Sequence, residues 1–115
     1  MSIDALHTLT IIETMENFLE RNRPPEDIRP ELDIGYRIEE QSIFIFEIRP
    51  KWLKPEEIME CMVAKTTYVN TKKLWKVFWM RSDLKWHSYL PTPTVKTIQA
   101  FVKLVEADDH HCFWG

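Results

Sequence analysis

The spacing of apolar residues changes twice along this chain, and these changes constrain its fold more than any other feature. Residues 3–21 carry apolar side chains at three- and four-residue steps, which is typical of an amphipathic helix with Ser2 or Asp4 as its N-cap. From Asp33 the step becomes two, as in a strand with one buried face. Helical spacing returns after Pro93, so the sequence predicts a helix, a set of strands and a second helix. The buried stripe of the first helix is expected to be Leu6, Leu9, Ile12, Met15 and Leu19.

The strands are expected between short polar or proline-containing segments. Ile34, Tyr36 and Ile38 alternate with polar residues, whereas residues 42–50 are apolar on both faces, which predicts a central strand covered on both sides. Further strands are expected at residues 62–69, 74–81 and 85–89. The predicted fold is therefore α+β, in one domain over residues 1–115: an N-terminal helix, a four- to five-stranded antiparallel meander and a C-terminal helix packed on the sheet.

The second helix is expected to begin at the Pro-Thr-Pro segment. Thr92 would be its N-cap and Pro93 its first helical residue, and the helix should end near Asp108. Its buried stripe is expected to be Val95, Ile98, Val102 and Val105, flanked by Phe101. In the aromatic tail we expect Cys112 and Phe113 to pack against the sheet, and Trp114 to complete a hydrophobic edge or a homodimer contact.

Composition excludes two large classes of nucleotide-binding protein. The 115 residues include only two glycines, so the chain lacks the glycine-rich loop of P-loop hydrolases and dinucleotide-binding dehydrogenases. The net charge of -3 gives no whole-molecule attraction to nucleic acid. Residues 1–40 hold ten acids and four arginines, a net charge of -6, while residues 41–115 hold eight acids and eleven lysines and arginines, a net charge of +3. Any affinity for phosphate must come from a local patch.

Cysteine usage and hydropathy indicate a compartment. Cys61 and Cys112 follow no secretory signal, so two reduced thiols are expected. No apolar run approaches the ~18 residues of a membrane span, so no contact with a membrane is expected. Together these observations predict a cytoplasmic protein.

Several sequence blocks carry a family resemblance. The blocks are RPPEDIRPELDIGYRIEEQSIFIFEIRP, VAKTTYV, KLWKVFWMRSDLKWHSYLP and the terminal CFWG. In this combination the chain is similar to the small bacterial proteins of the family named domain of unknown function 3024. The resemblance implies a bacterial, cytosolic, single-domain protein. It supplies no catalytic residue, cofactor or partner.

Aromatic and basic residues alternate densely between Lys72 and Tyr89. The cations of this segment could contact phosphates while Trp75, Trp79 or Trp86 stacks on bases, as in single-strand nucleic-acid binders. The cations are Lys72, Lys73, Lys76, Arg81 and Lys85. However, Trp75, Val77 and Trp79 share one strand face, which favours a core beneath a helix. Most of the rings are therefore expected to be buried, with Trp86 left exposed.

The C-terminal end of this run holds the candidate site that we favour. Arg81, Asp83, Lys85 and His87 form a polar ladder in which His87 beside an acid could act as a general base. A salt-bridge and hydrogen-bond network that fixes the turn is the alternative. The full set of candidate binding residues is Glu47, Arg49, Trp52, Arg81, Asp83, Lys85, Trp86 and His87.

A metal-dependent nuclease is a further alternative. Glu16 or Glu20, Asp33, and the Glu47-Ile48-Arg49 triplet resemble its acids and Glu-x-Lys in outline, with Mg²⁺ as the implied ion. Arg49 replaces the expected lysine, and an arginine cannot be tuned to position a water. The tail residues His110, His111 and Cys112 are metal-capable, but adjacent ligands point apart. No metal or cofactor is therefore expected.

The sequence as a whole favours a non-enzymatic domain that binds a protein partner or a small ligand, and a homodimer is compatible with it. A single-stranded nucleic-acid binder and a metal-dependent hydrolase are the alternatives.

Overall fold

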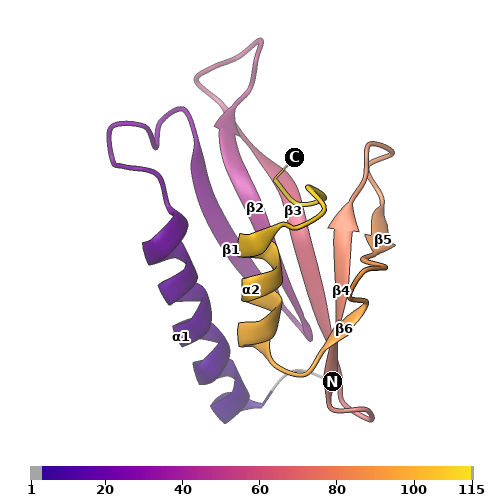
Figure 1. Ribbon diagram of the computed structural model, residues 1–115. Helices are drawn as coiled ribbons and strands as arrows, with labels where there is room; N and C mark the ends of the chain where they lie inside the picture. The colour runs from indigo at the N-terminus through magenta and orange to yellow at the C-terminus, as the bar shows by residue number, and fades with distance from the viewer. Residues whose placement is uncertain (1–3, 115) are drawn as a thin grey trace.

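The computed structural model describes residues 4–114, which form two helices and one antiparallel sheet (Figure 1). The elements, in chain order, are α1 (Ala5–Asn22), β1 (Asp33–Glu39), β2 (Ser42–Pro50), β3 (Ile58–Val69), β4 (Leu74–Met80), β5 (Trp86–Ser88), β6 (Thr94–Val95) and α2 (Ile98–Ala107). The predicted α+β class, with a helix at each end of the chain and strands between, is confirmed.

The sheet follows the predicted meander. Strands β1 to β5 are neighbours in chain order, and each pairs antiparallel with the next. The outer edge of β4 is shared, because β5 pairs with its C-terminal half and β6 with residues Trp75 and Lys76. The two-residue strand β6 was not predicted.

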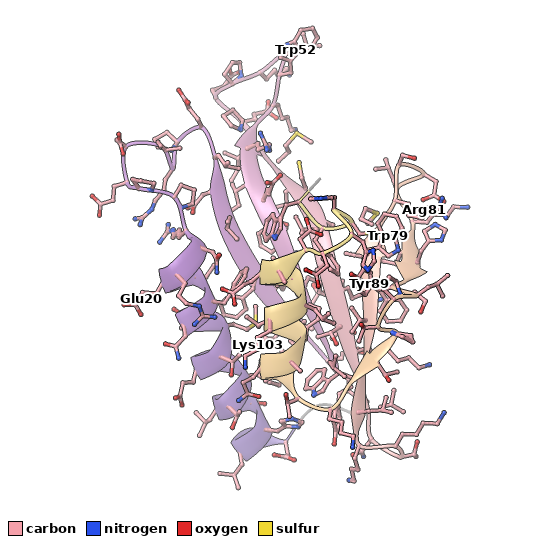
Figure 2. All side chains as sticks on the ribbon, viewed as in Figure 1. Glu20, Trp52, Trp79, Arg81, Tyr89 and Lys103 are labelled. Atoms are coloured by element: carbon pink, nitrogen blue, oxygen red, sulfur yellow. The ribbon has the colours of Figure 1, made fainter. Side chains whose placement is uncertain are left out.

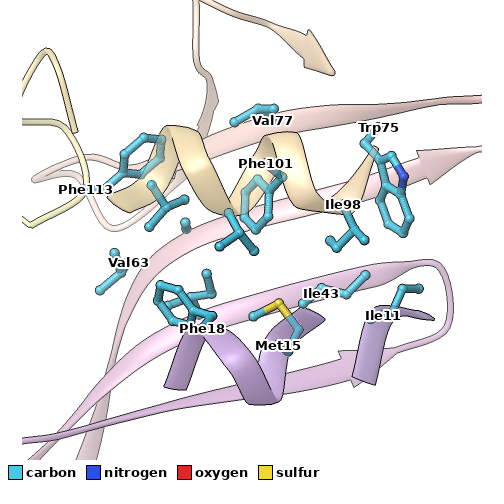
Figure 3. Packing of buried hydrophobic residues seen from close by; sticks show 14 of the residues in the cluster. Ile11, Met15, Phe18, Ile43, Val63, Trp75, Val77, Ile98, Phe101 and Phe113 are labelled. Carbon is cyan, nitrogen blue, oxygen red and sulfur yellow. The ribbon is translucent and has the colours of Figure 1, made fainter. Parts of the chain in front are cut away.

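Both helices lie on the same face of the sheet and enclose the hydrophobic core (Figures 1 and 3). On β4, Trp75 and Val77 are fully buried in this core, as their shared strand face predicted. The other main contributors are Ile11, Met15, Phe18, Ile43, Ile45, Val63, Tyr89, Ile98, Phe101, Val102, Val105 and Phe113. Val63 is the extra residue of a β-bulge, where the β2–β3 register shifts between Ile45 and Phe46.

Helix α1 buries only part of the predicted stripe: Met15 is fully buried and Leu19 packs against the core, but Leu6, Leu9 and Ile12 are exposed. Ile11, Met15 and Phe18 are fully buried, whereas Leu6 and Leu9 are 80% and 63% exposed. The reason is that this helix has apolar residues on two overlapping stripes, and contact with α2 and β1 selects the stripe through Ile11 and Phe18. The N-cap is Asp4, one of the two predicted, since its carboxylate accepts from the backbone N–H of His7 at 2.9 Å. Ser2 lies outside the described residues.

Helix α2 begins later than predicted. Its N-cap is Thr97, whose hydroxyl oxygen accepts from the backbone N–H of Ala100 at 3.1 Å, and not Thr92. Pro93 lies before β6, and its carbonyl accepts from the backbone N–H of Val77 at 2.9 Å. This segment stays extended because it supplies hydrogen-bond partners to the edge of β4. The helix ends, as predicted, at Asp108.

Strand β2 corrects a further prediction. It is central and apolar on both faces, but the helices cover only the face of Ile43 and Ile45. No helix in the described part of the chain lies on the opposite face, which carries Phe44 and Phe46. The second apolar face of β2 therefore has no helix over it: Phe44 is half-buried there, and Phe46 is buried beneath Arg37.

Candidate functional site

The sheet face turned away from the helices, here called the open face, carries aromatic rings and cations from all five meander strands. Strand registry places Phe44, Lys65, Phe78 and Ser88 in one row across β2 to β5. The side chains of the open face that concern us are Arg37, Phe44, Phe46, Ile48, Met62, Lys65, Lys76, Phe78, Met80 and Trp86. Most of them are half-buried by one another.

Lys65 occupies the centre of this face. Its Nζ lies 5.6 Å from the ring centroid of Phe44, 5.3 Å from that of Phe78 and 5.9 Å from that of Trp86. Lys65 forms no salt bridge with any described carboxylate. Three aromatic rings therefore stabilise the positive charge of this half-buried lysine through cation–π interactions. Because no described carboxylate pairs with the ammonium, it can still form an ion pair with a bound anion.

A second ring and cation lie on β1 and β2. Arg37 covers the ring of Phe46, with Cζ 5.1 Å from the centroid, and its Nη2 reaches both carboxylate oxygens of Glu60 at 2.8 Å. Phe46 lies against Gly35, where a Cβ would come within 2.9 Å of the ring. Because the charge of Arg37 is neutralised by Glu60, this end of the open face is less electropositive than the end at Lys65 and Lys76.

Two members of the polar ladder, Asp83 and His87, form a hydrogen-bond network that closes the turn, whereas the side chains of Arg81 and Lys85 take no part in it. Asp83 accepts from the backbone N–H of Lys85 at 3.0 Å, and its other oxygen lies 2.8 Å from Nε2 of His87. The bond to His87, followed by that to the Lys85 backbone, holds the pKa of Asp83 below its usual value. Leu84 adopts a left-handed φ of 61° in this turn. The network orients His87 on the face of the β4–β5 hairpin opposite to Trp86.

Arg81 and His87 line a pocket on that other side of the hairpin. The guanidinium of Arg81 lies 5.5 Å from the ring centroid of Trp79 (Figure 2). Both residues border a hollow of about 360 Å³. Leu90, Pro91 and Cys112 are further parts of its wall. Burial, then the nearby charge of Asp108, raises the pKa of the Cys112 thiol.

The remaining predicted site residues lie elsewhere. Glu47 and Arg49 form an ion pair at 3.2 Å on β2, and Trp52 is 90% exposed at the tip of the β2–β3 hairpin (Figure 2). Within residues 4–114, no hydrogen bond, ion pair or ring contact joins Glu47, Arg49 or Trp52 to the β4–β5 hairpin, so the eight candidates fall into separate groups. They divide into the group on β2 and the hairpin tip, the Arg81–Asp83–His87 group, Lys85, which is exposed in the β4–β5 turn, and Trp86 on the open face.

Lys65, Phe44 and Phe78 were not predicted as site residues. The sequence of β2 did indicate such a surface, because a strand with apolar side chains on both faces must either be covered on both sides or expose rings to solvent. Only the strand register shows which of these holds.

The arrangement expected of a nuclease does not form. Asp33 makes two bonds to Arg23, at 2.8 and 2.7 Å, which hold the pKa of this carboxyl below its usual value. Glu16 accepts from the hydroxyl of Tyr36 at 2.6 Å. Registry pairs Asp33 with Ile48, so Asp33 and Glu47 project from opposite faces. No group of three His, Cys, Asp or Glu residues suited to a metal ion occurs within residues 4–114.

Phe113 of the tail packs into the core as predicted, whereas Cys112 and Trp114 are half-buried. Phe113 is buried, with its ring centroid 4.9 Å from that of Tyr89, and the indole N–H of Trp114 donates to the carbonyl of Val105 at 2.9 Å. The carboxylate of Asp108 accepts from the backbone N–H groups of both Phe113 and Trp114. The tail therefore closes one end of the core.

A further hollow of about 420 Å³ lies between the two helices. Its Arg21 donates two bonds to Glu106, and Asn22 donates a third at 2.6 Å. These hydrogen bonds join α1 to α2, so the polar groups that form them already have partners within the protein.

The chain is thus an α+β protein whose antiparallel sheet carries two helices on one face and a surface of rings and cations on the other. It belongs to the family described as a domain of unknown function (DUF3024), whose model matches residues 3–115, and the resemblance seen in the sequence is confirmed. No curated protein and no solved structure matches the chain significantly. Of the described helices, neither has the length and apolarity needed to cross a bilayer.

Proposed function

We propose that this protein binds single-stranded nucleic acid on the open face, with Lys65 at the centre of the site. The observation that carries the proposal is the ammonium of Lys65, which lies among three aromatic rings and has no carboxylate partner among the described residues. Rings offer stacking surfaces to unpaired bases, and an ammonium offers an ion pair to a phosphate. The two kinds of contact needed by a single-strand binder thus occur side by side.

Charge along the chain supports the same face. The acidic N-terminal part, residues 1–40, supplies α1, the connector and β1, whereas residues 41–115 carry a net charge of +3, to which Lys65 and Lys76 on the open face contribute. At the β1–β2 turn, Glu39 and Glu40 border a hollow of about 610 Å³ beside Phe44. Their charge disfavours phosphates there, so a bound strand would run from Lys65 towards β4 and β5, where Lys76 and Lys85 are exposed.

A second copy of the chain is a less suitable occupant of this face. If a two-fold axis passed near the centre of two such faces, Lys65 of one copy would lie close to the same cation of the other. Such like charges are costly in a desolvated interface. Self-association is therefore an outcome that the experiment must distinguish.

Fluorescence anisotropy with a labelled oligothymidylate of about 12 nucleotides tests the proposal. Binding should be measurable at about 50 mM salt and weaken steeply as salt is added. Lys65→Gln should weaken binding and reduce the slope of log K against log salt by about 0.7, the value for one phosphate contact to a single strand. Lys103→Gln, which removes an exposed cation on α2, is the matched control and should change neither quantity.

Two results would overturn the proposal. One is the absence of salt-sensitive binding at about 50 mM salt by protein shown to be folded. The other is equal weakening by Lys65→Gln and Lys103→Gln. Sedimentation equilibrium of both variants tests self-association. If the protein is a dimer that Lys65→Gln dissociates, and if it binds no oligonucleotide, the open face is a dimer interface.

A protein partner at the β2–β3 hairpin tip is the second candidate, and it retains part of the site expected from the sequence. Trp52 is 90% exposed and Leu53 83%, and tryptophan is enriched among the residues that dominate protein interfaces. A photo-crosslinking residue placed at position 52 should give one discrete adduct in the source cell, which Leu53→Asp abolishes. The same residue at position 103 should give none, and identical adducts from both positions would exclude the tip.

The expected cytoplasmic location is part of the proposal. It is supported by Cys61 and Cys112, which are both free thiols.

A further inference from the structure

The pocket on the helix side of the β4–β5 hairpin has the chemistry of a second, independent site. Its volume of about 360 Å³ falls in the range of small-ligand pockets. Three of its walls, Trp79, Leu90 and Pro91, are apolar. The hairpin separates it from the open face, because His87 and Trp86 project from opposite sides of β5.

Two side chains of this pocket have hydrogen-bonding capacity that the described residues leave unused: the guanidinium of Arg81, which is a donor, and Nδ1 of His87, which is an acceptor when Nε2 carries the proton. Arg81 lies over the ring of Trp79 and forms no salt bridge with any described carboxylate. His87 is held through Nε2 by Asp83, and its Nδ1 has no hydrogen-bond partner within residues 4–114. A guanidinium stacked on a ring keeps its in-plane N–H groups available, and two parallel N–H groups match a carboxylate.

No described carboxylate lines this pocket, and hydrogen bonds to the nearby acids Asp83 and Asp108 partly offset their negative charge. Asp83 holds His87 and the backbone N–H of Lys85. Asp108 accepts from two backbone N–H groups of the tail, each at 3.0 Å. The thiol of Cys112 has a raised pKa and stays neutral near pH 7.

We infer that this pocket binds a small organic acid, with the carboxylate of the ligand on Arg81 and its flat apolar body against Trp79, Leu90 and Pro91. The site is pre-organised, since the turn is closed by bonds from Leu84 N–H to the Arg81 carbonyl at 2.9 Å and from Arg81 N–H to the Lys85 carbonyl at 3.3 Å. A pre-formed site loses little conformational entropy when a ligand binds.

Benzoate and benzamide form a matched pair of probes for the full chain, because they share a ring and differ in charge. Benzoate should shift the NMR signals of the Trp79 indole and the His87 imidazole saturably, with Kd on the order of 1 mM, as expected of a fragment. Benzamide should bind at least about 10-fold more weakly. Arg81→Gln should abolish saturation by benzoate, whereas Arg21→Gln, which removes an arginine of α1 outside both sites, should leave Kd unchanged.

Leu90→Asp provides a variant that does not depend on the stacked arginine. Leu90 is 80% exposed, so the change leaves the core intact and places a negative charge at the rim of the pocket. Binding of benzoate should fall at least about fivefold by charge repulsion. Equal affinities for benzoate and benzamide, or unchanged benzoate binding in folded Arg81→Gln and Leu90→Asp, would overturn the inference. So would shifts confined to signals other than those of the pocket residues.

Discussion

The rings of Trp86 and Phe44 lie with their centroids 6.0 Å apart, although β3 and β4 separate their strands in the sheet. Neighbouring strands are about 4.8 Å apart, so the two side chains must lean towards each other across the open face. The ammonium of Lys65, on β3, lies over both rings, 5.6 Å from the centroid of Phe44 and 5.9 Å from that of Trp86. This part of the open face is thus one continuous surface, to which the four consecutive strands β2 to β5 contribute.

Trp86 and Trp52 allow a matched test of where the nucleic-acid site lies. Trp86→Ala should weaken oligonucleotide binding by about 1–3 kcal/mol, roughly 5- to 150-fold, because a stacking ring is lost. Trp52→Ala should leave it unchanged, since Trp52 is at the distant hairpin tip. Anisotropy titration measures both, and thermal unfolding shows that each variant is folded. Equal loss in the two variants would place the site away from Lys65.

Gly35 is required by the packing of Phe46. A Cβ at position 35 would lie 2.9 Å from Cε2 and 3.1 Å from Cζ of this buried ring, so the ring must move. Gly35→Ala should lower the free energy of unfolding by about 1 kcal/mol, as overpacking does. Urea denaturation of the double-mutant cycle with Phe46→Leu tests the cause, because the penalty should largely disappear once the ring is gone. If Gly35→Ala lowered the free energy of unfolding equally with Phe46 and with Leu at position 46, the cause would be the backbone at position 35 and not contact with the ring.

Tyr36 makes stability sensitive to high pH. Burial, followed by its hydrogen bond to Glu16, raises the pKa of the phenol from 10.0 to about 12 in the folded chain. The neutral phenol is therefore favoured by folding, so its contribution is complete below pH 10 and is lost as pH rises towards 12. Tyr36→Phe should be less stable at pH 8, and its unfolding midpoint should fall less between pH 10 and 12 than that of the wild type. Parallel curves for the two proteins would contradict this assignment.

Asp108 joins α2 to the tail. It has a left-handed φ of 45°, and its carboxylate accepts from the backbone N–H groups of Phe113 and Trp114. Asp108→Ala should lower the free energy of unfolding by about 2–3 kcal/mol, because two bonds to a charged acceptor are lost and alanine disfavours this φ. Asp108→Asn should lose about half as much, since asparagine keeps an acceptor and tolerates the left-handed region. Chemical denaturation compares them, and indistinguishable variants would contradict the role of the side chain.

The sequence was most informative where its pattern admitted one arrangement. On β4, alternation by two leaves only two choices of buried face, and the pair Trp75 and Val77 identifies the correct one. The resemblance to an uncharacterised family was equally definite, although it carried no activity. In α1 the adjacent residues Ile11 and Ile12 allow two helical stripes, and the sequence contains no means of choosing between them.

The candidate site depended on contacts between distant parts of the chain. Asp83 and His87 are close in sequence, so their pairing could be anticipated, and the structure shows it as a hydrogen bond. Lys65, Phe44 and Trp86 are far apart in sequence, and no local pattern relates them. Strand registry brings them together.

By itself, then, the sequence determined the order of elements, the α+β class and the family, because local periodicity and turn residues act over a few neighbouring positions. Only the tertiary structure decided which face of α1 is buried, that β6 completes the edge of β4, and that the second face of β2 stays uncovered. Those features depend on how much apolar surface each element finds to pack against, which is a property of the whole assembled chain.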